Sequence, residues 1–303
     1  MIYPPALRRG DAIALIAPAG PLASDADLDA AVERVEALGL RAVRGEHVLG
    51  RHGYLAGTDA ERAADINAAL RDPAVRGIFA VRGGYGTTRL LDLVDYDALR
   101  ADPKVLLGYS DLTALLNVCT ARAGVVTFHG PVIALALGPL ERAWLQRAMF
   151  SDVPVGTLAV ERPCAIRAGR ARGRLAGGNL SLMAAMVGTP YEIDCTDAIV
   201  FLEEVEEAPY RIDRMLTQLR ASASFRRAAG IALGTFSNCD APEDAAPERR
   251  LTYVLADRLV DLGMPVVAGA PIGHEGEQWT LPIGAYATLD AASGTLAIEA
   301  ATS

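Results

Sequence analysis

Short apolar runs separated by amphipathic segments dominate the first half of the chain. The runs lie at 12–17 (AIALIA), 77–83 (GIFAVRG), 104–108 (KVLLG) and 125–128 (VVTF), and they show no regular alternation of apolar and polar positions. Such runs are typical of strands that are buried on both faces. Strands of this kind, joined by helices, predict a parallel α/β sheet in this half.

The segments between these runs have the pattern of helices. Ser24 precedes Asp27 by three residues, and Thr58 precedes Glu61 by three, which is the spacing of a signal for a helix N-terminus. Apolar residues follow at intervals of three and four in both segments, and again after residue 111. The first half is therefore predicted to alternate strand and helix.

The pattern changes near residue 150, where Pro, Gly and Arg become frequent and no helical period is visible. We therefore predict a first domain at 1–150, a linker at 151–170 and a second domain at 171–303. For the second domain the patterns predict helices at 179–187, after 209 and near 246–262, strands at 198–205 and 230–236, and a closing hairpin over 286–300.

Composition narrows the functional classes. The 303 residues carry a formal net charge of −8, which argues against nucleic-acid binding. The chain contains no run of 18 apolar residues, so no membrane span is predicted. Asp11, Pro18 and Pro21 break the apolar N-terminal stretch, so a secretion signal is not expected. Four widely separated cysteines form no CxxC pair, which favours a reduced cytoplasmic protein without a metal or redox site.

A serine stands at the corner between the run 104–108 and the helical pattern that follows it. In GYSDLTALL, Ser110 and Asp111 come directly after Gly108 and Tyr109. The carboxyl end of a parallel strand faces the crevice where α/β proteins bind ligands, and the nucleophile of α/β-hydrolases has this placement. Because the second glycine of G-x-S-x-G is missing, the residues alone also fit a serine or aspartate that caps the helix.

A nucleophilic serine requires a base, and the chain offers four histidines. His47 and His52 lie in a polar loop and fit ordinary surface residues. His129 ends a strand of the predicted sheet, and His274 lies in a glycine-rich loop between strands, where functional residues are frequent. Position alone does not choose between His129 and His274.

Two further stretches carry groups that such chemistry uses. The strand AIVFLEEV ends in Glu203 and Glu204, which alternation places on opposite faces, so that one carboxylate could orient a histidine. A solvated acidic strand end explains the pair equally well. In AVRGGYGTTRL, Gly83, Gly84 and Gly86 can bring backbone amides close to an anion. This spacing matches neither Walker A nor G-x-G-x-x-G, so no cofactor is predicted.

Taken together, these stretches resemble the LD-carboxypeptidase family of serine peptidases, which includes murein tetrapeptide carboxypeptidases and microcin C self-immunity peptidases. The resemblance covers most of the chain. It depends on six ordered motifs: RGGYG at 82–86, GYSDLTALLN at 108–117, FHGP at 128–131, GGNLSLM at 177–183, FLEEVEEAPYRIDRMLTQL at 201–219 and GHEGEQWTLPIG at 273–284.

The resemblance implies a catalytic triad of Ser110, Glu203 and His274. Ser110 corresponds to the nucleophile of the family, and Glu203, the first acid after the apolar strand, corresponds to its glutamate. His274, eight residues before the proline of LPIG, corresponds to its histidine. The family fold implies a Rossmann-like α/β N-terminal domain that carries the serine and a smaller C-terminal domain with β structure that carries the other two.

The implied activity is hydrolysis of an L,D-peptide bond, with release of the terminal D-alanine from murein tetrapeptides during peptidoglycan recycling. The backbone amides of Asp111 and Gly84 are expected to stabilise the oxyanion. Arg82 and Arg89 flank the glycine loop, and either is a candidate for binding the substrate carboxylate. Family members are commonly dimers, so a cytoplasmic homodimer without metal is expected.

Two other functions stay open at this point. A microcin-immunity-like enzyme would cleave an amide between a peptidyl or aminoacyl group and a modified nucleotide with the same triad. A non-catalytic α/β protein would instead use the glycine loop to cradle a phosphate or nucleotide, and Ser110 would only cap the helix.

Overall fold

The computed structural model describes residues 1–242, 244–276 and 278–303. The chain forms two compact units, and each contains segments that are distant in sequence. Unit 1 consists of Met1–Pro154, Thr280–Gly284 and Ala300–Ser303, and unit 2 consists of Val155–Trp279 and Ala285–Glu299.

Unit 1 is built on a six-stranded sheet in the order β12-β5-β4-β3-β1-β2, in which all strands except β12 are parallel. The predicted α/β class with a parallel sheet is therefore confirmed. The strands are β1 (Ala12–Ile16), β2 (Arg41–Arg44), β3 (Val75–Ala80), β4 (Val105–Gly108), β5 (Thr127–His129) and β12 (Leu281–Ile283). The helices are α1 (Asp25–Ala37), α2 (Asp59–Arg71), α3 (Tyr96–Ala101), α4 (Leu112–Ala123) and α5 (Pro139–Met149), with a short 3₁₀ turn η1 at Thr87–Arg89.

Local sequence explains most of these elements. Every residue of β1 and β4 is buried, as expected for strands without polar alternation. Both predicted capping boxes are present, with Ser24 and Asp27 at the start of α1 and Thr58 and Glu61 at the start of α2. Because β1, β3, β4 and β5 are parallel, their carboxyl ends meet at one edge of the sheet.

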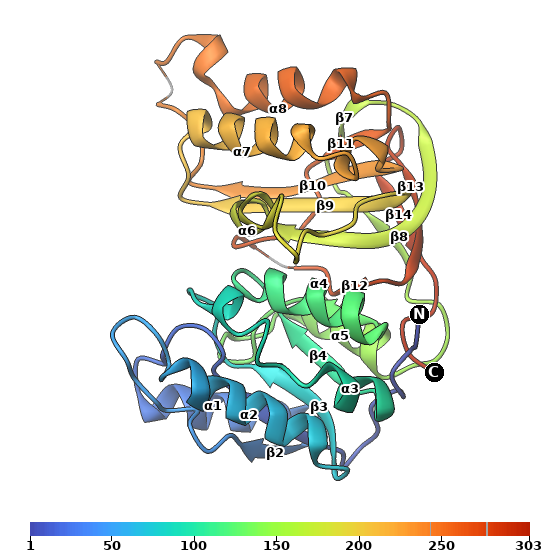
Figure 1. The fold of residues 1–303 in the computed structure, drawn as a ribbon. Helices are drawn as coiled ribbons and strands as arrows, with labels where there is room; N and C mark the ends of the chain where they lie inside the picture. The colour runs from blue at the N-terminus through green and yellow to red at the C-terminus, as the bar shows by residue number, and fades with distance from the viewer. Residues whose placement is uncertain (243, 277) are drawn as a thin grey trace. The chain divides into compact units, whose positions relative to one another are not determined.

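Two strands of unit 1 were not predicted. The strand β2, with the sequence RAVR, lies at the edge of the sheet and is exposed or half-buried, so its charged residues hide the strand pattern. The strand β12 has only three residues, and its partner β5 lies about 150 positions earlier in the chain. Leu281 and Ile283 are buried, and β12 (red in Figure 1) adds an antiparallel edge strand to this sheet.

Unit 2 contains an eight-stranded mixed sheet in the order β6-β14-β13-β8-β9-β10-β11-β7. The central strands β8 to β11 are parallel, and the outer strands pair antiparallel. They are β6 (Gly156–Ala159), β7 (Cys164–Arg167), β8 (Arg170–Asn179), β9 (Ala198–Val205), β10 (Gly230–Ser237), β11 (Val266–Ala268), β13 (Tyr286–Asp290) and β14 (Thr295–Ile298). The predicted closing hairpin is formed by β13 and β14.

Three helices cover one face of this sheet, and Figure 1 shows α7 and α8 side by side over β9 and β10. Apolar residues from these helices and from the parallel strands form one buried cluster, which includes Leu202, Ile212 and Leu255. The helices are α6 (Leu180–Met186), α7 (Pro209–Ala221) and α8 (Leu251–Leu259), with short 3₁₀ turns at Phe225–Arg227, Pro247–Arg249 and Val260–Leu262.

The segment 151–170, expected to be a linker, contains the strands β6 and β7. Both lie at the edges of the second sheet, where most of their residues are partly or fully exposed. An edge strand tolerates proline, glycine and arginine around it because one side of its backbone needs no partner. These residues therefore resemble a linker in the sequence although they belong to the sheet.

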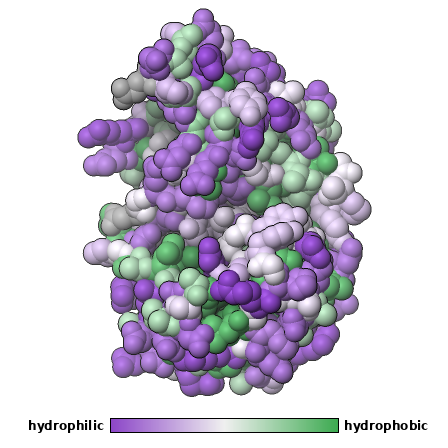
Figure 2. Space-filling view, turned by 90° about the vertical axis from the view of Figure 1, so that its left-hand side faces the viewer, coloured by the Kyte–Doolittle hydropathy of each residue, from purple (hydrophilic) through white to green (hydrophobic). Residues whose placement is uncertain are grey.

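The surface is mixed in character. Figure 2 shows one face of the molecule, on which hydrophilic residues predominate and hydrophobic residues occur in small groups. Within the part of the chain that the structure describes, no helix is both long enough and apolar enough to cross a bilayer.

Candidate active site

Ser110 lies in a strained turn between β4 and α4. Its φ angle is 62°, in the left-handed region that non-glycine residues rarely adopt. The amide of Leu112 donates to Tyr109 O at 3.2 Å, and the amide of Thr113 donates to Ser110 O at 2.9 Å. Asp111, the first residue before α4, makes no capping bond through its side chain. This geometry resembles a nucleophile elbow, and an ordinary N-cap residue has extended backbone angles instead.

The glycine loop after β3 passes directly beside Ser110. A Cβ atom added to Gly83 would lie 3.0 Å from Ser110 Cβ and 3.3 Å from Ser110 Oγ. Gly84 has a φ of 120°, and a Cβ added there would lie 3.0 Å from the Cα atom of Gly20. Side chains at these positions would push the loop away, so glycine is needed for the loop to approach both the serine and the turn after β1.

Thr87 joins the glycine loop to the residue that follows the serine. The backbone amide of Thr87 donates to Asp111 Oδ2 at 2.8 Å, and Thr87 Oγ1 donates to Asp111 O at 2.5 Å. Both residues are buried. Burial raises the pKa of the Asp111 carboxyl, and the hydrogen bonds from Thr87 partly oppose that rise. We call this pair of hydrogen bonds the Thr87–Asp111 clasp.

Arg62 also holds the glycine loop, through a hydrogen bond to Gly86. Its side chain is fully buried, and Nη1 donates to Pro18 O and, at 3.1 Å, to Gly86 O. Nη2 donates to Asp59 Oδ1 at 2.5 Å, which balances the buried charge. Sequence reasoning missed Thr87 and Arg62, because TT after a glycine loop and an arginine in a helix are both ordinary patterns.

Unit 2 places Glu203 and His274 in contact. Glu203 Oε2 lies 2.8 Å from His274 Nδ1, the Glu203 side chain is fully buried, and 18% of the His274 side chain is exposed. Gly273 allows this approach: its φ is 131°, and a Cβ there would lie 2.3 Å from Thr235 Oγ1 and 3.2 Å from Glu203 Cβ. A buried carboxylate on Nδ1 favours the tautomer in which Nε2 is the basic nitrogen.

Glu204 points to the other face of β9 and has a different role. Its Oε2 accepts hydrogen bonds from the amide and the hydroxyl of Ser181 at 2.8 and 2.7 Å. Its Oε1 accepts from Asn179 Nδ2 at 2.9 Å. These bonds hold the N-terminus of α6, where a negative charge is favourable. The structure therefore brings Glu203, and not Glu204, to His274.

The remaining histidines lie in unit 1. His129 is buried at the end of β5, with its ring 6.3 Å from that of Tyr109 in an edge-on arrangement. His47 and His52 lie in the loop between β2 and α2, as expected.

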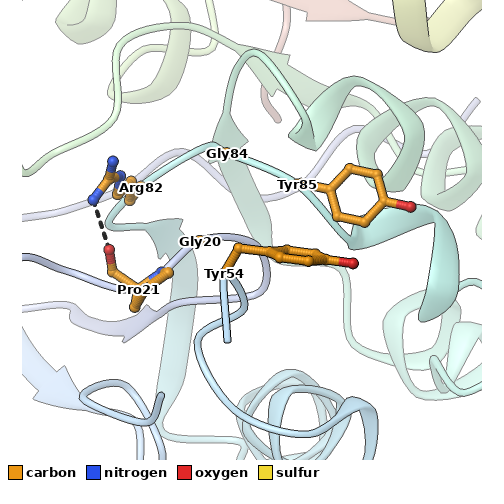
Figure 3. Close-up of a pocket in the computed structure, with 6 residues that line it drawn as sticks. All are labelled: Gly20, Pro21, Tyr54, Arg82, Gly84 and Tyr85. Carbon is orange, nitrogen blue, oxygen red and sulfur yellow. Dashed lines mark hydrogen bonds between the residues drawn. The ribbon is translucent and has the colours of Figure 1, made fainter. Parts of the chain in front are cut away.

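The two candidate arginines differ in their partners. Arg89 forms a bidentate ion pair with Asp59 through three contacts of 2.8 to 3.0 Å, and this hydrogen bonding lowers the pKa of Asp59. Arg82 donates through Nη1 to Pro21 O at 2.7 Å and has no acidic partner among the described residues. It lines a pocket of about 500 Å³ (Figure 3), together with Gly20, Pro21, Tyr54, Gly84 and Tyr85.

The predicted site residues thus fall into two groups. Unit 1 carries Ser110, Asp111 and the glycine loop, and unit 2 carries the Glu203–His274 pair. Among residues 1–242, 244–276 and 278–303, no group of three or more His, Cys, Asp or Glu side chains could hold a metal ion. The four cysteines form no disulfide, and three of them are buried.

Comparison with known families gives two matches. A family model described as the LD-carboxypeptidase N-terminal domain matches residues 13–130, and one described as the LD-carboxypeptidase C-terminal domain matches residues 172–289. These ranges include Ser110 in the first match and Glu203 and His274 in the second.

Individual proteins are similar over almost the whole chain. A protein of Bacillus subtilis named "Probable murein peptide carboxypeptidase" is 38% identical over 305 residues, which cover 99% of this chain and 95% of the relative. The muramoyltetrapeptide carboxypeptidase from Oxalobacter formigenes is 32% identical with a TM-score of 0.87, covering 96% of this chain and 100% of the other. An MccF-like protein from Bacillus anthracis is 27% identical with a TM-score of 0.88, covering 99% and 100%.

Proposed function

The chain belongs to the LD-carboxypeptidase family, and on that premise we propose that it is a serine carboxypeptidase that releases the terminal D-alanine from murein tetrapeptides. The names of the relatives in Bacillus subtilis and Oxalobacter formigenes support the murein substrate. The observation that carries the proposal is the buried Glu203–His274 pair, in a chain whose Ser110 stands on a strained elbow. A peptidase needs these three groups to activate an alcohol.

In the proposed reaction, His274 Nε2 takes the proton of Ser110 Oγ as that oxygen attacks the carbonyl carbon before the terminal D-alanine. Glu203 accepts the hydrogen bond from Nδ1 and holds the imidazole in the reactive tautomer. The tetrahedral intermediate collapses when His274 returns the proton to the amine of D-alanine, which leaves. Water, activated by the same histidine, then hydrolyses the ester on Ser110 and restores the enzyme.

The backbone amides of Asp111 and Gly84 are proposed to donate to the oxyanion of this intermediate. One donor of this kind contributes about 3 kcal/mol to lowering the barrier, provided that it is held in place before the reaction. The Thr87–Asp111 clasp and the bonds of Arg62 supply such restraint to the loop that carries Gly84.

Replacing Thr87 by valine should lower kcat about tenfold and leave KM within about twofold, because the shape is kept while the hydroxyl that binds Asp111 O is lost. Steady-state kinetics of D-alanine release measures both values. Thr87→Ser keeps the hydroxyl and is the matched control, for which most of kcat should be retained. Equal losses of kcat in the two variants would mean that the clasp does not position the donors.

Arg82 is the preferred candidate for binding the carboxylate of the terminal residue. Its guanidinium has no acidic partner among the described residues, whereas that of Arg89 is already paired with Asp59. Both arginines flank the loop that carries Gly84, and a bidentate arginine suits a free carboxylate.

Full activity is expected after dialysis against a strong chelator, because every proposed step uses Ser110, His274, Glu203 or a backbone amide. The rate of D-alanine release before and after dialysis is the measurement. Loss of activity that returns when Zn²⁺ is added would contradict the serine mechanism.

A second substrate is compatible with the same groups. The similarity to the MccF-like protein favours testing an aminoacyl-nucleotide amide beside the tetrapeptide, and the ratio of the two kcat/KM values separates the two functions.

We also propose that the chain works as a cytoplasmic homodimer. Light scattering tests the dimer, and cell fractionation tests the compartment.

A further inference from the structure

The pocket beside Arg82 lies where the chain reverses direction across the first sheet. In the order β12-β5-β4-β3-β1-β2, the chain runs from β1 to β2 on one side and returns to β3 on the other. Ligands of open α/β sheets bind at the carboxyl ends of the strands that flank this reversal. Gly20 and Pro21 follow β1, and Arg82, Gly84 and Tyr85 follow β3. The topology therefore predicts a ligand at this pocket independently of Ser110.

The pocket is also adjacent to the proposed nucleophile. Gly83 packs against the side chain of Ser110, and its neighbour Gly84 lines the pocket. A substrate whose carbonyl lies between Ser110 and the amide of Gly84 would have the next residue within reach of this space. In a carboxypeptidase that residue is the one that is released, and it carries a free carboxylate.

The charge of the pocket fits such a carboxylate. Arg82 is the one charged residue among those that line the pocket, and of its guanidinium nitrogens only Nη1 donates a hydrogen bond within the described part of the chain, to Pro21 O. The other guanidinium N–H groups are available to an anion. The cation therefore selects a group of negative charge, which the terminal residue supplies.

The opposite part of the pocket is aromatic. Figure 3 shows the backbone of Gly20 and Gly84 between Arg82 on one side and the rings of Tyr54 and Tyr85 on the other. The rings pack edge-on with centroids 5.4 Å apart, although 67% of Tyr54 and 52% of Tyr85 is exposed. The pocket thus offers a cation to a carboxylate on one side of the glycines and two rings to an apolar or aromatic side chain on the other.

We propose that this pocket is a subsite for the released residue and that it accepts terminal D-residues with large apolar or aromatic side chains as well as D-alanine. Arg82 binds their carboxylate, and Tyr54 and Tyr85 pack against the side chain. The volume of about 500 Å³ exceeds what alanine fills, and contact with the rings offsets the larger entropy loss of a longer side chain. This inference rests on the proposed function.

The test compares three tetrapeptides that differ only in the last residue, which is D-alanine, D-leucine or D-phenylalanine. The wild-type protein should release D-phenylalanine with a kcat/KM at least equal to that for D-alanine. Tyr54→Ala and Tyr85→Ala should each lower the ratio of the D-phenylalanine value to the D-alanine value about tenfold. The corresponding substitutions Tyr54→Phe and Tyr85→Phe keep the ring and should keep the ratio.

Tyr253→Ala, at an exposed tyrosine of α8, is the control for loss of a surface ring and should leave both values unchanged. Efficient release of D-alanine with a D-phenylalanine value more than about a hundredfold lower would overturn the subsite and leave the proposed function standing. Release of none of the three residues would overturn the proposed function itself. If neither Tyr54→Ala nor Tyr85→Ala changes the ratio of the kcat/KM for D-phenylalanine to that for D-alanine, the side chain of the released residue lies outside this pocket.

Discussion

Replacing Ser110 by alanine is expected to reduce kcat for release of D-alanine by about 10⁴- to 10⁶-fold, because the attacking oxygen is removed while the rest of the site is kept. The fold should survive. Only one oxygen atom is lost, and the strained φ of 62° is as accessible to alanine as to serine.

The measurement is single-turnover release of D-alanine, with thermal unfolding of the same preparations as the check on folding. Ser293→Ala is a matched control, since Ser293 lies in the exposed turn between β13 and β14. Both variants should unfold within a few degrees of the wild type. Turnover by Ser110→Ala above about 1% of the wild-type rate would remove Ser110 from the role of nucleophile.

The second large effect is expected for Glu203. Glu203→Gln keeps the shape but replaces the carboxylate that faces His274 Nδ1, so the imidazole is no longer held as a base at Nε2, and kcat should fall by about 10³- to 10⁴-fold. KM should change much less, because Glu203 does not contact substrate in the proposed reaction. Steady-state kinetics that separate kcat from KM make the measurement.

The neighbouring residue provides the control. Glu204→Gln weakens the hydrogen bonds to Ser181 that hold the N-terminus of α6, so it should lower Tm by several degrees and leave kcat within about threefold. The opposite pattern, in which Glu204→Gln abolishes turnover and Glu203→Gln only lowers Tm, would show that Glu204, and not Glu203, supplies the carboxylate that orients the histidine.

The sequence predicted the parts of the fold in which local pattern and tertiary burial agree. Uninterrupted apolar runs predicted β1 and β4, because both strands are buried on both faces. It did not predict β2, whose residues are charged and exposed, or β12, which is only three residues long. Residues 151–170 have the composition of a linker, so the edge strands β6 and β7 within them could not be predicted from local pattern.

For the site, the residues supported candidates, and the resemblance chose among them. The turn at Ser110 could be predicted from a buried strand that meets a helix, but its left-handed backbone could not. The alternation that separates Glu203 from Glu204 was visible, but which of them faces His274 depends on a loop about 70 positions later in the chain. Thr87 and Arg62 gain their roles only from packing between distant segments, so no local pattern marks them.

The most direct test of the claim that Ser110 and His274 act as one catalytic unit is the kcat of Ser110→Ala, of His274→Ala and of the double variant. If the two side chains perform one proton-coupled attack, the double variant should be no slower than either single variant, within about threefold. A double variant slower than the wild type by the product of the two separate effects would contradict the account.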